Sequence, residues 1–203
     1  MKQLSLIAKT AVSCVAVFSA LALTSCGGEL VQVDGQTYDI EKMASYEMPN
    51  SSMEPTLYQG ETIFVTPFET EKHRDGTSTS VNADVSGGDV VAFYDPVMGG
   101  RILIKRVVAV EGETVDIRDG DLVVDGVIPF ESFTERGLTE RSQSDSADIF
   151  YPYEVPSGHV FVLGDNRANS QDGRDFGSIP VDSIVGIAEI AYSPAIEEYV
   201  AVE

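Results

Sequence analysis

A series of short runs of β-branched and apolar residues, separated by Gly, Asp and Pro, dominates the sequence beyond residue 60. Runs of this length between turn-forming residues are typical of β-strands, and Asp119-Gly120 between two of them is a strong hairpin signal. No amphipathic helix of more than two turns stands out, although Pro55–Gln59 could form one short turn. The sequence therefore predicts an all-β or nearly all-β domain. The predicted strands are Thr62–Thr66, Asp89–Tyr94, Arg101–Val110, Thr114–Ile117, Leu122–Val124, His159–Leu163 and Ile184–Ala191.

Three other segments show neither a strand nor a helix period. Phe68–Gly88 and Glu131–Asp148 are rich in Ser, Thr, Asp and Glu, which is typical of surface loops. Residues 27–45 are predicted to be a linker that could hold one strand. The chain has 203 residues, which suits a single domain, expected over residues 46–203, behind an N-terminal leader.

Residues 1–26 have the form of an export leader. Lys2 and Lys9 precede Thr10–Leu23, an uncharged stretch that is shorter than the roughly 18–20 residues that span a bilayer comfortably. The segment 23–26, LTSC, resembles a bacterial lipoprotein box, in which Cys26 would be lipidated. Two alternatives stay open: a leader retained as a membrane span, and self-cleavage after the ALA motif at 20–22. In each case the positive start stays in the cytoplasm and the rest is exported.

The composition disfavours several classes of partner. A formal net charge of −20 argues against nucleic acid, whose phosphates need clustered Lys and Arg. The two cysteines, Cys14 and Cys26, lie in or beside the leader, so no disulfide framework is expected. The chain has only His73 and His159 and no cysteine cluster, so we expect no metal site and no cofactor. A Ser–His–Asp triad stays open but is disfavoured.

The predicted strand at residues 101–110, RILIKRVVAV, carries two cations among apolar residues. Successive strand residues face opposite sides, so Lys105 and Arg106 lie on different faces, both otherwise largely apolar. Arg stays charged in proteins, whereas a desolvated Lys can lose its proton. A neutral Lys amine beside a Ser hydroxyl is a competent general base. The alternative is that Lys105 extends to water.

Two polar turns could supply the other groups of a site. The segment 48–66, MPNSSMEPTLYQGETIFVT, places Ser51 and Ser52 on a turn whose backbone N–H groups could form an oxyanion hole. The segment 164–174, GDNRANSQDGR, can lock itself through internal hydrogen bonds and ion pairs. Taken alone, each segment is also consistent with an ordinary structural loop.

Together these segments resemble the sequence boxes of type I signal peptidases, which remove leader peptides from exported proteins. The nucleophile box of that family, Ser-Met-x-Pro-Thr, matches residues 52–56, and its Gly-Asp strand box matches 88–93. Its Lys-Arg box matches 105–112, and its Gly-Asp-Asn-Arg box matches 164–174. Each box alone is weakly specific, whereas four boxes in the right order are highly specific. The resemblance covers roughly residues 46–191.

The resemblance implies a role for each matched residue. Ser52 would be the nucleophile, with its own backbone N–H as a donor to the oxyanion, and Lys105 would be its general base. Ser170 would hydrogen-bond and orient the Lys105 amine. Asp172 and Arg174 would form the supporting network.

The chain also departs from the family pattern. Asn50 stands where some relatives carry a Ser whose hydroxyl completes the oxyanion hole, and its amide could donate there instead. Ala168 replaces a residue that is polar in many relatives, so one supporting bond could be missing. The lipoprotein box at Cys26 is unusual in a family that normally keeps a membrane-spanning anchor.

The resemblance further implies a mostly β fold of coiled antiparallel sheets, with an apolar face near the membrane and an active site on the extracytoplasmic side of the cell membrane. The expected partners are the signal peptides of preproteins and membrane lipid, and the secretion translocon could be another. The alternatives are a specialised processing peptidase for one substrate, a self-cleaving repressor, and a catalytically silent lipoprotein that binds peptides.

Overall fold

The computed structural model describes residues 23–25, 28–72, 78–81, 84–134, 138–140 and 149–203. These residues form antiparallel β-sheets with one short helix, α1 (Gly173–Phe176), which confirms the predicted mostly β fold. Of the leader predicted at residues 1–26, residues 1–22 and the candidate lipidation residue Cys26 lie outside the described residues. Within the described ranges, no helix has the length and apolar character needed to cross a membrane.

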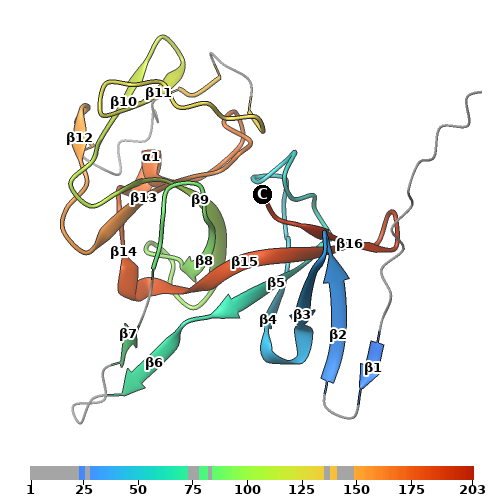
Figure 1. Ribbon diagram of the computed structural model, residues 1–203. Helices are drawn as coiled ribbons and strands as arrows, with labels where there is room; N and C mark the ends of the chain where they lie inside the picture. The colour runs from blue at the N-terminus through green and yellow to red at the C-terminus, as the bar shows by residue number, and fades with distance from the viewer. Residues whose placement is uncertain (1–22, 26–27, 73–77, 82–83, 135–137, 141–148) are drawn as a thin grey trace, which may run out of the picture.

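An eight-stranded antiparallel sheet forms the centre of the molecule (Figure 1). Its last strand, β4, leads directly into the turn that carries Ser52, and β16 (Glu198–Ala201) joins the sheet by pairing with β15. The strand order is β14 (Ile179–Pro180), β13 (His159–Leu163), β9 (Ile102–Val110), β8 (Val90–Tyr94), β15 (Ile184–Ser193), β5 (Thr62–Pro67) and β4 (Ala44–Glu47).

The long strand β15 joins the two halves of this sheet. One edge of β15 pairs with β5, while the other pairs first with β8 and then, further along, with β16. Register shifts interrupt the pairing of β15 with both β5 and β8. Such β-bulges bend a strand and increase its twist, so the sheet coils instead of staying flat.

Smaller sheets extend from opposite ends of the main sheet (Figure 1). At one end, β10 (Thr114–Arg118) pairs with β11 (Asp121–Val124) and β12 (Tyr153–Glu154). The predicted Asp119-Gly120 hairpin joins β10 to β11, and the φ angles of 52° and 82° are those of a primed hairpin turn. At the other end lies the sheet of β1 (Leu23–Ser25), β2 (Gly28–Val33) and β3 (Gln36–Asp39). The hairpin of β6 (Glu69–Lys72) and β7 (Ser78–Val81) continues from β5 at a separate corner, the lower left of Figure 1.

Buried apolar side chains fix the position of the Ser52 turn. Met53 and Leu57 are fully buried, and Met48 is nearly so. All three pack in one cluster with Ile63 and Val65 of β5. Because a close-packed core leaves large side chains little freedom, these anchors on both sides of Ser52 hold the turn against the sheet.

Residues 27–45 hold more structure than the predicted linker. They contain the hairpin β2–β3, a 3-10 turn at Ile40–Lys42 and the first two residues of β4. Val31 and Val33 of β2 are buried in a cluster with Ile190 of β15. The hairpin is stable because it covers an apolar patch formed by strands some 160 residues later in the chain, and no local period reveals such a contact.

Other differences concern short elements. The predicted loop Phe68–Gly88 contains the paired strands β6 and β7. The segment at 55–59 forms turns without a helix. Helix α1 has only four residues, too few for a periodic pattern, and it is held by a capping box between Asp172 and Asp175.

We predict that Gly186→Ala destabilises the fold by about 1–3 kcal/mol, since overpacking forces strands apart. A Cβ at Gly186 would lie 2.1 Å from Thr66 O and 2.8 Å from Pro67 Cα, in the pairing of β15 with β5. Urea unfolding measures the change. Gly87→Ala is the matched control, because nothing lies within 4 Å of its added Cβ. Equal stability of the two variants would contradict the prediction.

Candidate active site

The structure brings Ser52 and Lys105 together. Ser52 lies on the turn after β4, and Lys105 lies in the middle of β9. The Lys105 Nζ is 2.7 Å from Ser52 Oγ. Both residues are buried, with 6% of Ser52 and 3% of Lys105 exposed, so the hydrogen bond is largely shielded from water.

Burial changes the acidity of the Lys105 amine. Desolvation lowers the pKa of Lys105 from its ordinary 10.5 to about 8, and the negative charges of Asp172 and Asp165 oppose this shift in part. The ammonium form therefore predominates below this value, and the neutral amine predominates above it. In the neutral form the 2.7 Å contact lets the nitrogen accept the Ser52 hydroxyl proton. Of the two environments left open for Lys105, the structure therefore shows the apolar one, and the alternative that Lys105 extends to water is wrong.

The Lys105 amine does not make the hydrogen bond to Ser170 that was expected to orient it. The amine makes its second hydrogen bond to the backbone oxygen of Ile104, at 2.8 Å. Ser170 Oγ is buried and has no hydrogen-bond partner among the described residues. It lies against Gly164, where an added Cβ would come within 2.2 Å of it. Because the Ile104 carbonyl belongs to the same strand as Lys105, the backbone itself orients the amine in this state.

The loop 164–174 clamps the backbone of the Ser52 turn. The Asn166 N–H donates to Ser52 O at 3.1 Å, and Asn166 Nδ2 donates to Ser51 O at 3.0 Å. Asn169 Nδ2 donates to Ser51 Oγ at 3.0 Å. A Cβ at Gly164 would lie 2.5 Å from Ser52 O, so this close approach requires glycine. The turn is therefore held on one side by hydrogen bonds from the loop 164–174 and on the other by its buried apolar side chains.

Asp172 and Arg174 form the predicted supporting pair. Asp172 is fully buried, and its two oxygens accept from Arg174 Nε at 2.8 Å and Nη2 at 2.9 Å. The same carboxylate accepts from the Gly164 N–H at 3.0 Å, at the point where β13 enters the loop. Bidentate pairs of this kind fix geometry as well as charge. The pair thereby ties α1 to the loop that clamps Ser52.

A second buried ion pair, Arg106 with Asp165, was not predicted as part of the site. Arg106 Nε and Nη2 donate to the two oxygens of Asp165 at 2.9 Å and 2.7 Å. Thr56 Oγ1 donates to Asp165 Oδ2 at 2.5 Å, which links the pair to the far end of the Ser52 turn. The sequence did carry a signal, because a cation in the middle of an apolar strand needs a buried acid partner. It could not indicate which of many acids this is.

The described part of the predicted loop Glu131–Asp148 contacts Arg167 and Arg106, two of the buried arginines beside the site. Arg167 Nη1 donates to Thr139 Oγ1 at 3.0 Å, and Arg167 Nη2 donates to Glu131 Oε1 at 2.5 Å. The Phe133 ring lies over the Arg106 guanidinium, 3.9 Å from its carbon to the ring centroid. This segment therefore covers the buried ion pairs and keeps them from water.

The side chain of Asn50 makes a different hydrogen bond from the one expected of an oxyanion donor. Its side-chain oxygen Oδ1 accepts a hydrogen bond from the Ser52 backbone N–H at 3.0 Å. The side chain is exposed, at the start of the turn. Asn50 is therefore a hydrogen-bond acceptor here. Its partner is the Ser52 backbone N–H, the group that was expected to donate to the oxyanion.

A groove of about 200 Å³ opens beside the Ser52–Lys105 pair. One wall is formed by the end of β4 and the residues after it, and the other by the start of β9. Its lining residues are Tyr46, Glu47, Met48, Pro49, Asn50, Ser52, Ile102, Leu103, Ile104 and Lys105. A larger hollow of about 570 Å³ borders Pro55 and Thr56. Neither Ser52 nor Lys105 lines it, so the smaller groove is the one beside the candidate catalytic pair.

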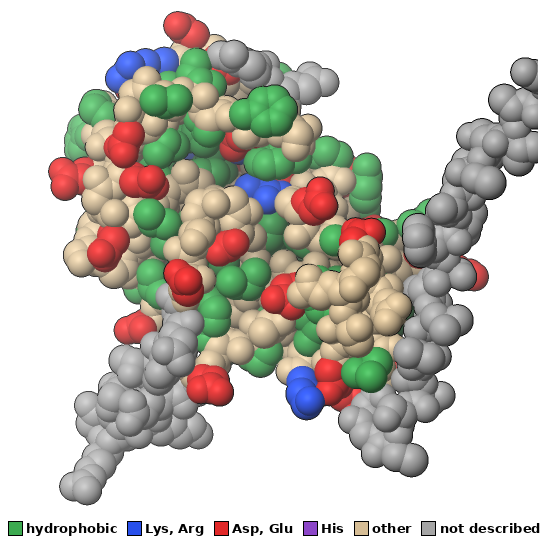
Figure 2. Space-filling view, viewed as in Figure 1, with side chains coloured by type: hydrophobic (Ala, Val, Ile, Leu, Met, Phe, Trp, Pro, Cys, Tyr) green, Lys and Arg blue, Asp and Glu red, His purple; other side chains and the backbone are tan. Residues whose placement is uncertain are grey.

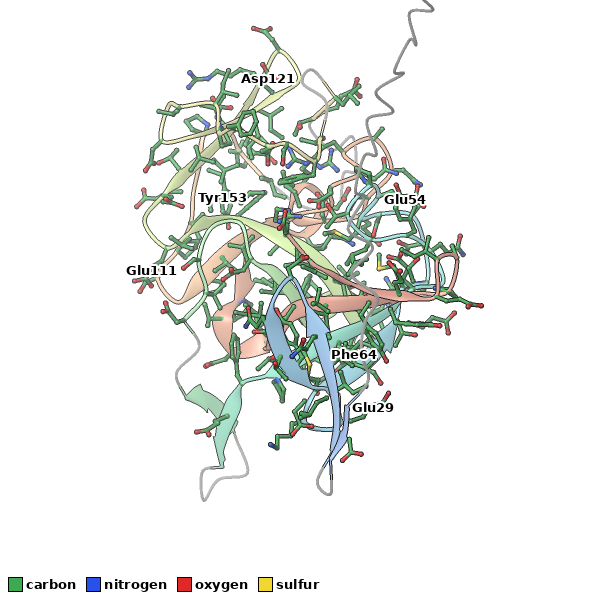
Figure 3. All side chains as sticks on the ribbon, turned by 45° about the vertical axis from the view of Figure 1, so that its right-hand side comes forward. Glu29, Glu54, Phe64, Glu111, Asp121 and Tyr153 are labelled. Atoms are coloured by element: carbon green, nitrogen blue, oxygen red, sulfur yellow. The ribbon has the colours of Figure 1, made fainter. Side chains whose placement is uncertain are left out.

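The visible surface of the molecule is acidic. Figure 2 shows Asp and Glu side chains scattered over the visible face, with few Lys or Arg side chains, in agreement with the net charge of −20. In Figure 3, Glu54 marks the Ser52 turn at the surface, between Asp121 of the small sheet and Phe64 of β5. Within the part of the chain that the structure describes, no group of three or more His, Cys, Asp or Glu is placed to hold a metal ion.

Comparison with known proteins gives consistent matches. The family model described as signal peptidase, peptidase S26, matches residues 37–193. A probable signal peptidase I-1 of Synechocystis is 33% identical over 155 residues, covering 73% of this chain and 70% of that protein. Signal peptidase I T of Bacillus subtilis is 32% identical over 153 residues, covering 73% of each chain.

Two further similarities are more partial. Thylakoidal processing peptidase 1 of Arabidopsis thaliana is 31% identical over 157 residues, covering 72% of this chain and 41% of that longer protein. A crystal structure of a signal peptidase I from Enterococcus faecalis is 32% identical, with a TM-score of 0.40, and covers 51% of this chain and 96% of that chain.

We predict that the Lys105 amine titrates near pH 8, because burial disfavours its charged form. NMR titration of protein carrying ¹³Cε-labelled lysine measures this value, and Lys105→Arg assigns the signal. Lys42 is the internal control: it is fully exposed, and its hydrogen bond to Asp39 raises its pKa above the ordinary value. A Lys105 midpoint at or above that of Lys42 would exclude the desolvated amine.

Proposed function

Because the chain belongs to the type I signal peptidase family, peptidase family S26, we propose that it removes signal peptides from exported preproteins with Ser52 as nucleophile and Lys105 as general base. The observation that carries this assignment is the 2.7 Å contact between Ser52 Oγ and a buried Lys105 Nζ. A Ser hydroxyl is a weak nucleophile at its free pKa, and an adjacent base activates it.

The proposed reaction proceeds in two stages. Neutral Lys105 takes the Ser52 hydroxyl proton as Ser52 Oγ forms a bond to the scissile carbonyl carbon. The tetrahedral intermediate then collapses, the C–N bond breaks, and the Lys105 ammonium gives its proton to the leaving amine. Water attacks the resulting acyl-enzyme while Lys105 accepts a proton from it; the bond between the acyl carbon and Ser52 Oγ then breaks, and the Lys105 ammonium returns that proton to Ser52 Oγ. The Ser52 N–H stabilises the negative oxygen of each intermediate.

The supporting groups act through this pair. Asp172 with Arg174, and Asp165 with Arg106, hold the loop and the turn in register, so that Ser52 and Lys105 stay in contact. Ser170 is proposed as a second partner for the amine once the site rearranges around a substrate. Its buried, unpaired hydroxyl is available for that role.

The substrate would be an extended leader peptide. β4 pairs only with β5 among the described strands, so its other edge is open to strand addition beside the groove. Ile102, Ile104 and Met48 line this groove, whose volume of about 200 Å³ suits small side chains before the cut. The site would work on the extracytoplasmic face of the cell membrane, where membrane lipid and the translocon are proposed partners.

Ser52→Ala and Lys105→Ala should each lower kcat/KM for preprotein cleavage by at least about a thousandfold, because removing either member of a nucleophile–base pair disables both. Lys105→Arg is the matched variant: it keeps a long cationic side chain but cannot lose its proton. The measurement is release of the mature N-terminus from a purified preprotein.

The same assay tests the base from the pH profile. Since only the neutral amine can accept a proton, kcat/KM should rise with pH through about 8 and then level off. Thermal unfolding midpoints close to that of the parent protein ensure that lost activity is not lost folding. Near-parental cleavage by Lys105→Arg would rule out Lys105 as the base.

We further propose that Cys26 is the mature anchor. The segment 23–26 has the form of a lipoprotein box, and two or more acyl chains suffice for stable membrane attachment. Mass spectrometry of the cellular protein should find a lipidated N-terminal Cys26. An N-terminus at Leu23 would instead indicate self-trimming, and an intact Met1 would indicate a retained membrane span.

Two alternative functions stay testable. A specialised peptidase would process one exported protein, whereas a general one would process many. Comparing secreted proteomes with and without the gene distinguishes these. A silent peptide-binding lipoprotein would bind leader peptides without cleaving them, and the preprotein assay excludes it if mature product appears.

A further inference from the structure

The donor that the reaction needs is already occupied in the free site. The Ser52 N–H donates to Asn50 Oδ1 at 3.0 Å, an ordinary hydrogen-bond length. The substrate's carbonyl oxygen would need the same N–H when it becomes an oxyanion. A single N–H cannot donate fully to two oxygens at once. Asn50 and the substrate oxygen therefore compete for one donor.

The position of Asn50 allows this competition to be resolved by substrate binding. Asn50 is exposed and lines the groove beside Ser52, so nothing in the described core holds its side chain in place. With Oδ1 turned toward Ser52, the amide NH₂ group points away from that N–H. A peptide carbonyl entering the groove would meet the Asn50 oxygen in the space it has to fill.

The relative strengths of the two bonds decide the outcome. The Asn50 bond joins neutral groups, whereas a bond from the same N–H to an oxyanion is charge-assisted and roughly twice as strong. The oxyanion therefore displaces Asn50 in the transition state. The displaced bond still has to be broken, and this raises the barrier relative to a site without the cap.

We propose that Asn50 is a removable cap on the oxyanion donor, a positioning residue that withholds the Ser52 N–H until a substrate carbonyl replaces it. This inference rests on the proposed function of Ser52 and Lys105. It reverses the role expected for Asn50 from the family pattern, because the side chain acts as an acceptor that competes with the substrate and not as a donor that assists it.

The test compares two substitutions in the full-length protein by measuring cleavage of a purified preprotein. The pH is kept above the Lys105 pKa of about 8, so that the amine is neutral. Asn50→Ala removes the cap, so kcat/KM should rise by about two- to tenfold, the value of one neutral hydrogen bond. Asn50→Asp keeps the acceptor and adds a negative charge beside the oxyanion, so kcat/KM should fall by about tenfold or more. Binding of a peptide aldehyde, whose Ser52 adduct places an oxygen in the same position, should change in the same directions.

Other roles for Asn50 give different patterns. If Asn50 donates to the oxyanion, both variants lose activity, and Asn50→Ala falls by about a hundredfold. If Asn50 only shapes the turn, Asn50→Ala loses activity while Asn50→Asp, which can make the same turn bond, keeps it. Either pattern overturns the cap, as does an unchanged rate in Asn50→Ala.

Glu111→Ala provides the matched control. Glu111 is also exposed and also caps a backbone N–H, that of Gly158 at 2.6 Å. Figure 3 shows it on the opposite side of the molecule from Glu54 of the Ser52 turn. Its loss should leave kcat/KM unchanged. If the parent protein does not cleave, or cleaves without Ser52, the proposed function fails; if it cleaves through Ser52 but Asn50→Ala does not accelerate, only the cap fails.

Discussion

The desolvation of one amine is the constraint on which the rest of this structure depends. Lys105 can act as a base near neutral pH only if its strand is buried on both faces, which explains a β9 that is apolar in both directions. Two buried carboxylates, Asp165 and Asp172, oppose this effect, because their negative charges raise the pKa of Lys105. Each of these carboxylates is paired in bidentate fashion with an arginine, Arg106 or Arg174. The arginines therefore limit the influence of the acids while keeping their hydrogen bonds.

Ser52, the proposed nucleophile, is held by a different set of contacts. Apolar anchors at Met53 and Leu57 fix the turn from below, and hydrogen bonds from Asn166 fix its backbone from the loop side. These contacts hold Ser52 and Lys105 rigid relative to each other, as the proposed proton transfer over their 2.7 Å hydrogen bond requires. Asn50 is outside both sets and is exposed. The part of the turn that has to change during the reaction is thus the part that the core does not hold.

Local patterns in the sequence were sufficient for some features and not for others. The β-branched runs correctly predicted five strands of the main sheet, β5, β8, β9, β13 and β15, but not β4, β14 or β16. The two apolar faces around Lys105 indicated that it is buried, which the structure bears out against the alternative that it extends to water. The hairpin β2–β3 was missed, although its Asp34-Gly35 turn has the same form as the turn at 119–120, because its stability comes from packing on β15. The partner of Arg106 could not be predicted for a related reason. Asp165 is 59 residues away, and only the folded sheet determines which acid meets the guanidinium.

The open edge of β4 connects substrate binding to the capped donor. β4 continues without a break into the groove wall and then into Asn50, so a peptide that pairs with this edge extends toward the Ser52 N–H. Main-chain hydrogen bonds along a strand position each peptide carbonyl before any chemistry occurs. A peptide carbonyl that is positioned by strand pairing comes close enough to Asn50 to displace it from the Ser52 N–H. A water molecule makes no strand pairing and is not positioned in this way. In this arrangement the binding energy of an extended peptide is used to uncover the donor, so the site would favour substrates that engage the strand edge over short peptides that reach Ser52 alone.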